Sequence, residues 1–302
     1  MPEVKNPIEK ETFAEYRYAL NYCIINYSYS FYTWEDWERE LDWMALSGVN
    51  LMLAPVGTEL VWYNTLTRLG YTREQSLSFI SGPAFTAWWL IGNLEGWGGK
   101  VSLESIQQQA QLQQKILKRM DELGIEPILQ GFYGMVPHDL TSKLPGFKNA
   151  TVIDQGHWVG RESIRPGIII STSSHFGKIA DVYYQELKKL YGKKIHYFGG
   201  EPFHEGGKSG TIEVAKVASK IQSTMQKHFP NSTWVLQGWQ NNPSNQILKG
   251  VDKKKTLVIE LFGENTNNWE KREAYNGTPF IWSNVSNFDE KKWTIWEATT
   301  IY

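Results

Sequence analysis

Hydrophobic positions follow two different periods along most of the chain. Short runs of bulky apolar residues alternate with longer stretches in which apolar positions recur every three or four residues. The short runs predict buried β-strands, and the longer stretches predict amphipathic helices. The strands are expected to begin at residues 19, 49, 125, 195, 233, 256 and 279. Strands that alternate with helices form βαβ units, so the pattern predicts a parallel sheet.

Two long segments interrupt the alternation, at residues 82–99 and 134–166. Both are rich in Gly, Pro, Trp or His, and neither has a clear period. Loops of this length usually either carry a function or are disordered. The three Trp of the first segment, at positions 88, 89 and 97, argue against disorder.

A doubly wound open sheet would show the same alternation, but it should carry a Gly-rich phosphate-binding turn after its first strand. The first predicted strand, Ala19–Ile25, is instead followed closely by Tyr-Ser-Tyr-Ser-Phe-Tyr. Candidate functional segments follow several strands, as on the catalytic face of a (β/α)8 barrel. We therefore predict an α/β fold, a TIM-like barrel over residues 16–302 after a polar lead-in at residues 1–15. Because residues 286–302 show no clear eighth strand, we expect the barrel to be truncated near its last strand.

Composition adds a leaning toward carbohydrate. The chain has 302 residues, and its 14 Trp, 15 Tyr and 13 Phe make up 14% of them. Aromatic rings stack on the apolar faces of sugars, although a large aromatic core is an equal alternative. The net charge of -1 argues against nucleic acid or an anionic membrane as a partner. No apolar run approaches the ~20 residues that span a bilayer.

A single cysteine, Cys23, excludes an internal disulfide. Residues 1–15 are charged and contain Pro, so they do not resemble a signal peptide. We expect the full-length protein to be exported, with its signal outside this sequence.

Two carboxylates follow the strand predicted at residue 195, in the stretch Ile195–Glu205. Glycoside cleavage needs an acid beside the leaving oxygen and a carboxylate, or a substrate group acting in its place, on the other face of the sugar. Glu205 is the candidate acid. Glu201 is either its partner or a structural acid paired with a basic neighbour. Glu260 and Glu264 end a later strand, and each either faces the same cavity or has an orienting or structural role.

Other candidates are polar or aromatic residues near strand ends. Asn21 and Cys23 lie two residues apart on the first predicted strand, so their side chains should share a face and contact a ligand. The alternative for Cys23, a small buried hydrophobe, is the more common role of a free cysteine. Trp239 is either a sugar platform or a core residue. The histidines lack the spacing of a metal site, and we predict neither metal nor cofactor.

Several motifs together resemble the α-N-acetylglucosaminidase family of glycoside hydrolases, in order from about residue 16 to about residue 288. They include R-Y-x-x-N-x-C from Arg17, W-E-R-E-L-D-W-M-A-L-S-G-V-N-L from Trp37, G-P-A-F-x-A-W from Gly82, G-N-L-x-x-W from Gly92, F-G-G-E-P-F-H-E ending at Glu205, W-V-L-Q-G-W ending at Trp239, and P-F-I-W from Pro279.

The resemblance implies a retaining exo-hydrolase that removes terminal α-linked N-acetylglucosamine from a glycan. It places the acid/base on Glu205 and sugar contacts on Asn21, Cys23 and Trp239. Trp97 and Asn93 share one family motif and are weaker candidates for ligand contact. His204 and Glu201 complete the expected substrate-binding set.

Two departures qualify this resemblance. The family usually has Asn before the acid, where this chain has His204, whose imidazole could donate to a sugar oxygen. The family nucleophile lies in a Met-x-Pro-Glu-Gly motif that does not occur here, and neither Glu290 nor Glu297 replaces it. The chain by itself is therefore expected to be inactive. Two alternatives stay open: a non-catalytic carbohydrate-binding protein on the same barrel, and a hydrolase that uses the substrate's acetamido group, oriented by Glu201.

Overall fold

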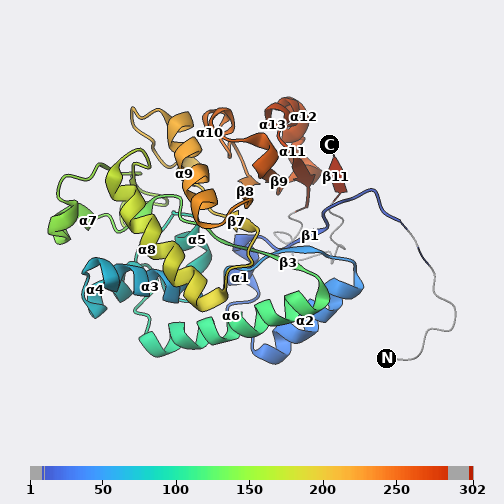
Figure 1. The fold of residues 1–302 in the computed structure, drawn as a ribbon, viewed down its shortest axis with the longest axis horizontal. Coiled ribbons are helices and arrows are strands. Elements are labelled where there is room, and N and C mark those ends of the chain that lie inside the picture. The colour runs from blue at the N-terminus through green and yellow to red at the C-terminus, as the bar shows by residue number, and fades with distance from the viewer. Residues whose placement is uncertain (1–8, 10, 285–298, 302) are drawn as a thin grey trace.

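Seven parallel strands form the centre of the computed structural model, which describes residues 9, 11–284 and 299–301, and helices surround them (Figure 1). The seven strands are those that the sequence predicts. In sheet order they are β1 (Tyr18–Ala19), β2 (Leu51–Leu53), β3 (Glu126–Gln130), β7 (Tyr197–Gly199), β8 (Thr233–Gly238), β9 (Thr256–Glu260) and β10 (Phe280–Trp282).

The sheet curls into a barrel that is nearly closed. Tyr22, just after β1, donates a hydrogen bond to Gln130 at the end of β3, and its hydroxyl would lie 2.8 Å from a Cβ placed on Gly199 of β7. Seven parallel strands agree with the predicted truncated barrel. No strand was apparent in residues 286–302 from the sequence, but β11 (Thr299–Ile301) pairs antiparallel with β10. Among the described residues no pairing joins β11 to β1.

The start of the barrel corrects the first predicted strand. That strand was expected to span Ala19–Ile25, but β1 ends at Ala19, and α1 (Tyr22–Tyr27) follows. Leu20 has a left-handed backbone with φ of +71°. The side chain of Asn21 then accepts a hydrogen bond from the Ile24 backbone N–H at 3.1 Å, which caps the helix. The cap outweighs the β-branched and aromatic residues that suggested a longer strand.

The helices outside the barrel follow the predicted periodicity. The longer ones are α2 (Trp34–Leu46), α3 (Thr58–Leu69), α4 (Arg73–Phe79), α6 (Leu103–Leu123), α8 (Ser174–Tyr191), α9 (Val214–His228) and α10 (Asn245–Gly250). Short helices α11 (Gly263–Thr266), α12 (Asn268–Lys271) and α13 (Glu273–Gly277) and the 3₁₀ turns η1 (Pro145–Phe147), η2 (His204–Gly206) and η3 (Lys253–Lys255) complete them. α2 packs on α6 along one side of the barrel (Figure 1).

The two long irregular segments are folded. The first contains α5 (Thr86–Leu90). The second contributes β4 (Met135–Val136), β5 (Val152–Ile153) and α7 (Leu140–Lys143). Together with β6 (Gly167–Ile169), β4 and β5 form a second small sheet in the order β4-β6-β5. This segment rests beside α8 and shapes one wall of the site described below.

The aromatic residues fill much of the core. Every one of the largest fully buried side chains is aromatic, among them Trp62, Trp89, Phe132 and Tyr183, which form one connected group of rings. Burying a large apolar side chain stabilises the fold by about 1.5–3 kcal/mol. The aromatic-core interpretation of the composition is therefore correct for this group.

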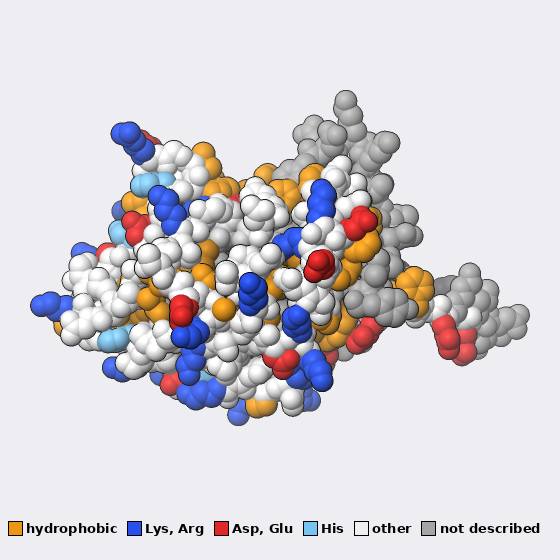
Figure 2. Space-filling view, turned by 90° about the horizontal axis from the view of Figure 1, so that it is seen from above, with side chains coloured by type: hydrophobic (Ala, Val, Ile, Leu, Met, Phe, Trp, Pro, Cys, Tyr) orange, Lys and Arg blue, Asp and Glu red, His pale blue; other side chains and the backbone are white. Residues whose placement is uncertain are grey.

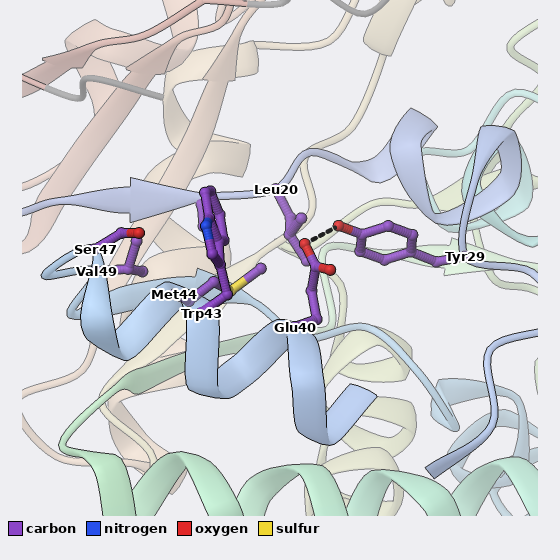
Figure 3. A pocket seen from close by; sticks show the side chains of 8 residues that line it. Leu20, Tyr29, Glu40, Trp43, Met44, Ser47 and Val49 are labelled. Carbon is purple, nitrogen blue, oxygen red and sulfur yellow. Dashed lines mark hydrogen bonds between the residues drawn. The ribbon is translucent and has the colours of Figure 1, made fainter. Parts of the chain in front are cut away.

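The outer surface shows mixed charges on one face and a small hollow beside β1. On the face seen in Figure 2, acidic and basic side chains are interspersed. A hollow of about 40 Å³ lies between β1 and α2, where the Tyr29 hydroxyl donates to Glu40 at 2.7 Å beside Trp43 and Met44 (Figure 3). It is far too small for a sugar. No helix in the described part of the chain is long and apolar enough to cross a membrane.

Candidate functional site

The site is built around the loop that follows β7. Gly200 makes the turn with φ of +92°, and a Cβ there would lie 2.5 Å from Gln130 Nε2 and 2.7 Å from a ring carbon of Tyr133. Only glycine satisfies both conditions without strain. The chain then runs through Glu201 into η2, which contains Glu205. The predicted order of strand, acidic loop and helix is confirmed.

Glu205 sits on a strained backbone. Its φ and ψ are +45° and +52°, and Phe203 is also left-handed with φ of +64°. Each such residue costs about 1–2 kcal/mol when it is not glycine. Strain of this kind persists where surrounding contacts enforce it, and it clusters at functional sites. One of these contacts is the backbone N–H of Phe203, which donates to Gln155 Oε1 at 3.2 Å.

Both carboxylate oxygens of Glu205 accept hydrogen bonds from residues far away in the sequence. Trp239 Nε1 donates to Oε1 at 2.9 Å, and Asn93 Nδ2 donates to Oε2. Trp239 directly follows β8, and Asn93 follows α5 in the first irregular segment. The structure thus brings together three residues that the sequence proposed separately. Glu205 is partly buried, and its carboxylate faces these donors.

Asn93 is held in turn by Arg165. The guanidinium donates to Asn93 Oδ1 at 2.6 Å, to the His204 carbonyl at 2.9 Å and to the Glu205 carbonyl at 2.7 Å. Asn93 and Arg165 are 0% and 2% exposed. Burial lowers the pKa of Arg165, and the neighbouring Glu205 carboxylate raises it in opposition. The side chain of Asn93, which itself donates to the Glu205 carboxylate, and the backbone of the strained loop therefore meet at one buried cation.

Cys23 and several aromatic rings lie close to the carboxylate. Burial, and then the negative charge of Glu205, raise the pKa of the Cys23 thiol to about 12, so the thiol is neutral at physiological pH. Burial, and then Cys23 and Glu205, also raise the pKa of Tyr27, one helical turn further on. Its ring meets Trp88 edge-on at 5.5 Å, and Trp88 stacks on Trp158 at 6.2 Å. These rings provide apolar faces near the acid.

Glu201 and His204 form a buried pair under the loop. They are 4% and 3% exposed, and 3.3 Å separates Glu201 Oε1 from His204 Nε2. Burial raises the pKa of Glu201 to about 8. The backbone N–H of Gln237, which donates to the carboxylate, lowers this pKa in opposition. Burial and the charge of Arg165 lower the pKa of His204 to about 3. At neutral pH the pair therefore contains a protonated carboxyl and a neutral imidazole, although its spacing is that of an ion pair.

The remaining predicted residues have other surroundings. The oxygen of Asn21 caps α1, and Cys23 lies inside that helix, so the expectation that they share a strand face is wrong. The backbone of Trp97 is tied to Ser81 and Gly82. Glu260 is fully buried and accepts hydrogen bonds from Tyr275 and Thr266, which supports its structural interpretation.

Sequence reasoning missed Arg165 and the group of Tyr27, Trp88 and Trp158. Arg165 lies in an irregular segment, next to Pro166 and Gly167, and no motif or spacing marks it as functional. The aromatic segments did signal a wall of rings, but nothing in the sequence shows that residue 27 meets residue 88.

A larger hollow of about 230 Å³ lies behind the Gly92–Gly96 segment. Glu95, Tyr71 and His138 line it, and His138 Nδ1 lies 2.7 Å from Glu95 Oε1. Its polar groups contact one another, and it does not include Glu205.

The described geometry agrees with known proteins of one family. Residues 17–297 match the family model described as the alpha-N-acetylglucosaminidase (NAGLU) tim-barrel domain. The human alpha-N-acetylglucosaminidase is 31% identical over 95% of this chain and 40% of its own length.

Solved structures agree with this match. A family 89 glycoside hydrolase from Clostridium perfringens, in complex with 2-acetamido-1,2-dideoxynojirmycin, is 39% identical with a TM-score of 0.87, over 93% of this chain and 32% of the other. A double Glu-to-Gln variant of CpGH89 from the same organism, in complex with its substrate GlcNAc-alpha-1,4-galactose, is 40% identical with a TM-score of 0.85, over 90% and 31%. The chain thus spans less than half the length of these relatives.

Proposed function

The chain belongs to the alpha-N-acetylglucosaminidase family, and we propose that its barrel binds a terminal α-linked N-acetylglucosamine unit and carries the general acid/base that releases it. The observation that carries this proposal is the placement of Glu205, which is held by Trp239 and Asn93 at the end of a barrel strand. Residues at that end of a TIM barrel are typically catalytic.

Glu205 has the surroundings that a proton-transfer group needs. Its two oxygens are fixed by the indole N–H and the amide N–H, and each keeps a second lone pair for a proton or a substrate. In the first step the carboxyl would give its proton to the glycosidic oxygen, and in the second it would take one from water. Such a group contributes typically 10²–10⁴-fold to the rate.

The sugar itself would lie between the carboxylate and the aromatic rings of Tyr27 and Trp88. Relatives in this family bind an acetamido-bearing iminosugar and GlcNAc-alpha-1,4-galactose, which supports a GlcNAc-terminated glycan as the ligand of this chain. The neutral Cys23 thiol near Glu205 offers a weak polar contact. The side-chain oxygen of Asn21 accepts the helix-cap hydrogen bond, so Asn21 would contact a sugar through its amide N–H groups.

We assign the second carboxylate of a retaining mechanism to no residue of this chain. The scheme in which Glu201 orients the acetamido group has less support, because Glu201 is buried against His204 and Gln237. Retention follows from the family resemblance and is a further part of the proposal. NMR of the first-formed sugar tests it, because release of the β-anomer would contradict it.

Turnover of an aryl α-N-acetylglucosaminide tests the acid/base, and calorimetry with GlcNAc-α-1,4-galactose tests binding. Glu205→Gln should lower turnover about 10²–10⁴-fold and leave the dissociation constant within a few-fold. Glu38→Gln, an exposed change on α2, is the matched control. Wild-type binding without turnover would fit both a barrel that lacks its nucleophile and the carbohydrate-binding alternative, and the absence of both binding and turnover would overturn the proposal.

A further inference from the structure

We propose that Arg165 is a positioning residue for Glu205: it fixes which way the Asn93 amide faces and holds the carbonyls of residues 204 and 205, so that the carboxylate is presented in one orientation. This inference rests on the proposed role of Glu205 as the acid/base. It adds a residue that the sequence did not single out and that does not itself touch the reacting atoms.

The first argument concerns the amide of Asn93. An amide side chain has one accepting end and one donating end of nearly the same shape, and it can face either way. Arg165 has only donors, and it lies 2.6 Å from Asn93 Oδ1. The accepting end must therefore face Arg165, which turns Nδ2 toward Glu205 Oε2. Without the guanidinium, nothing among the described contacts prevents the amide from presenting its oxygen to the carboxylate.

The second argument concerns the backbone. Arg165 donates to two successive carbonyls, those of His204 and Glu205, at 2.9 and 2.7 Å. These carbonyls belong to the left-handed segment in which Phe203 and Glu205 have positive φ. The planar guanidinium places several donors at fixed angles, so it can hold two carbonyls and an amide oxygen together. An ammonium group has no such fixed fork.

The third argument concerns the free-energy cost of burying the Arg165 cation. Arg165 is 2% exposed and, within the described residues, forms no ion pair within 4 Å. Removing a charged group from water costs several kcal/mol unless its surroundings compensate. Here neutral oxygens accept from the two terminal nitrogens of the guanidinium, whereas its buried Nε has no hydrogen-bond partner among the described residues. The negative charge of Glu205 raises the pKa of Arg165 against the effect of burial. Stability alone would be served as well by an apolar side chain, whereas orienting Glu205 requires this one.

Arg165→Lys tests the proposal through the leaving group. A general acid matters most when the departing group is a poor one, because a good leaving group departs without a proton. With an alkyl or phenyl α-N-acetylglucosaminide, Arg165→Lys should lower kcat/KM about 10- to 100-fold, the usual effect of losing a hydrogen bond to a charged group. With the 2,4-dinitrophenyl substrate the loss should be threefold or less. Equal losses on both substrates would show a purely structural role and overturn the proposal.

Controls separate this outcome from general damage. Arg68→Lys alters another arginine that joins α3 to Glu186 of α8, away from Glu205, and it should affect both substrates equally. Asn93→Ala should reproduce the leaving-group dependence, and the double variant should lose less than the two single losses combined, because Arg165 acts partly through Asn93. A fully additive double variant would contradict that route.

A readout without turnover keeps the test decisive if the chain binds but does not hydrolyse. The Trp239 indole N–H donates to Glu205, so its NMR resonance, assigned with Trp239→Phe, reports the carboxylate position. Arg165→Lys should move this resonance, and Arg68→Lys should not. An unmoved resonance in Arg165→Lys would overturn the inference, whereas a Glu205→Gln variant without any leaving-group dependence would instead reject the proposed function.

Discussion

Glu201 makes stability depend on pH in a direction that an ordinary carboxylate would not. Its pKa is raised from 4.5 to about 8 by burial, so the folded chain keeps a proton that the unfolded chain releases above pH 4.5. Stability from this group is therefore lost as the pH rises from about 4.5 to about 8. Glu201→Gln, which is neutral at every pH, should remove this dependence.

The neighbouring His204 narrows the useful range. Its pKa is lowered from 6.5 to about 3 by burial, so it costs stability as the pH falls through 6.5, and this effect fades within about one pH unit above that value. The effect is shared by the wild type and Glu201→Gln, so the difference between them from pH 6.5 to 8 reports Glu201. One proton of difference changes the free energy of unfolding by about 1.4 kcal/mol per pH unit. Because Glu201 begins to ionise in the folded chain as the pH approaches its pKa, the change over the window is about 1–2 kcal/mol.

The assay is urea unfolding of the wild type and of Glu201→Gln at half-unit steps from pH 6.5 to 8. The variant should gain about 1–2 kcal/mol relative to the wild type across this range, whatever the constant offset between them. Glu38→Gln, on the exposed surface of α2, should run parallel to the wild type. A constant difference for Glu201→Gln would show that the carboxyl is already ionised in the folded protein and would refute the reasoning.

Three further substitutions test the site. Trp239→Phe keeps a ring but removes the N–H that Glu205 accepts, so kcat/KM for a poor leaving group should fall about 10- to 100-fold while the sugar's Kd changes little; an unchanged kcat/KM would contradict this. Gly200→Ala should lower the unfolding free energy by about 2–4 kcal/mol, more than Gly99→Ala, which has a similar φ but an open space; equal losses would exclude crowding. Asn21→Ser keeps a helix cap, so the melting temperature should hold; a tenfold lower kcat/KM would then assign Asn21 to the sugar, and an unchanged one to the cap alone.

The barrel could be predicted because strands and helices alternate along the sequence, and each type has its own hydrophobic period. All seven parallel strands begin within two residues of the expected positions, and the largest shifts are from 49 to 51 and from 195 to 197. The start of the chain could not be predicted, because the hydrogen bond that the Ile24 backbone N–H donates to the Asn21 side chain decided between strand and helix. β11 lay beyond any visible pattern.

Glu205, Trp239 and Asn93 could be named individually from motifs, but their contacts could not. Whether two loops meet depends on tertiary packing that periodicity does not encode. Arg165 is the clearest example, since its role arises only from where residues 93 and 204–205 come to lie. For Glu201, pairing with a basic neighbour was one of two alternatives; His204 does lie beside it, but burial keeps the carboxyl protonated and the imidazole neutral, which only the structure could show.

The site's residues are distant in the sequence, and this has a consequence for how the protein folds. Asn93 and Glu205 are 112 residues apart, Arg165 and Asn93 72, and Trp239 and Glu205 34. Closing loops of these lengths costs entropy before any contact is gained, so such contacts tend to form late. The acid's surroundings should thus mature after the helices have docked, and kinetic refolding followed through the Trp239 indole would report the end of assembly and not its beginning.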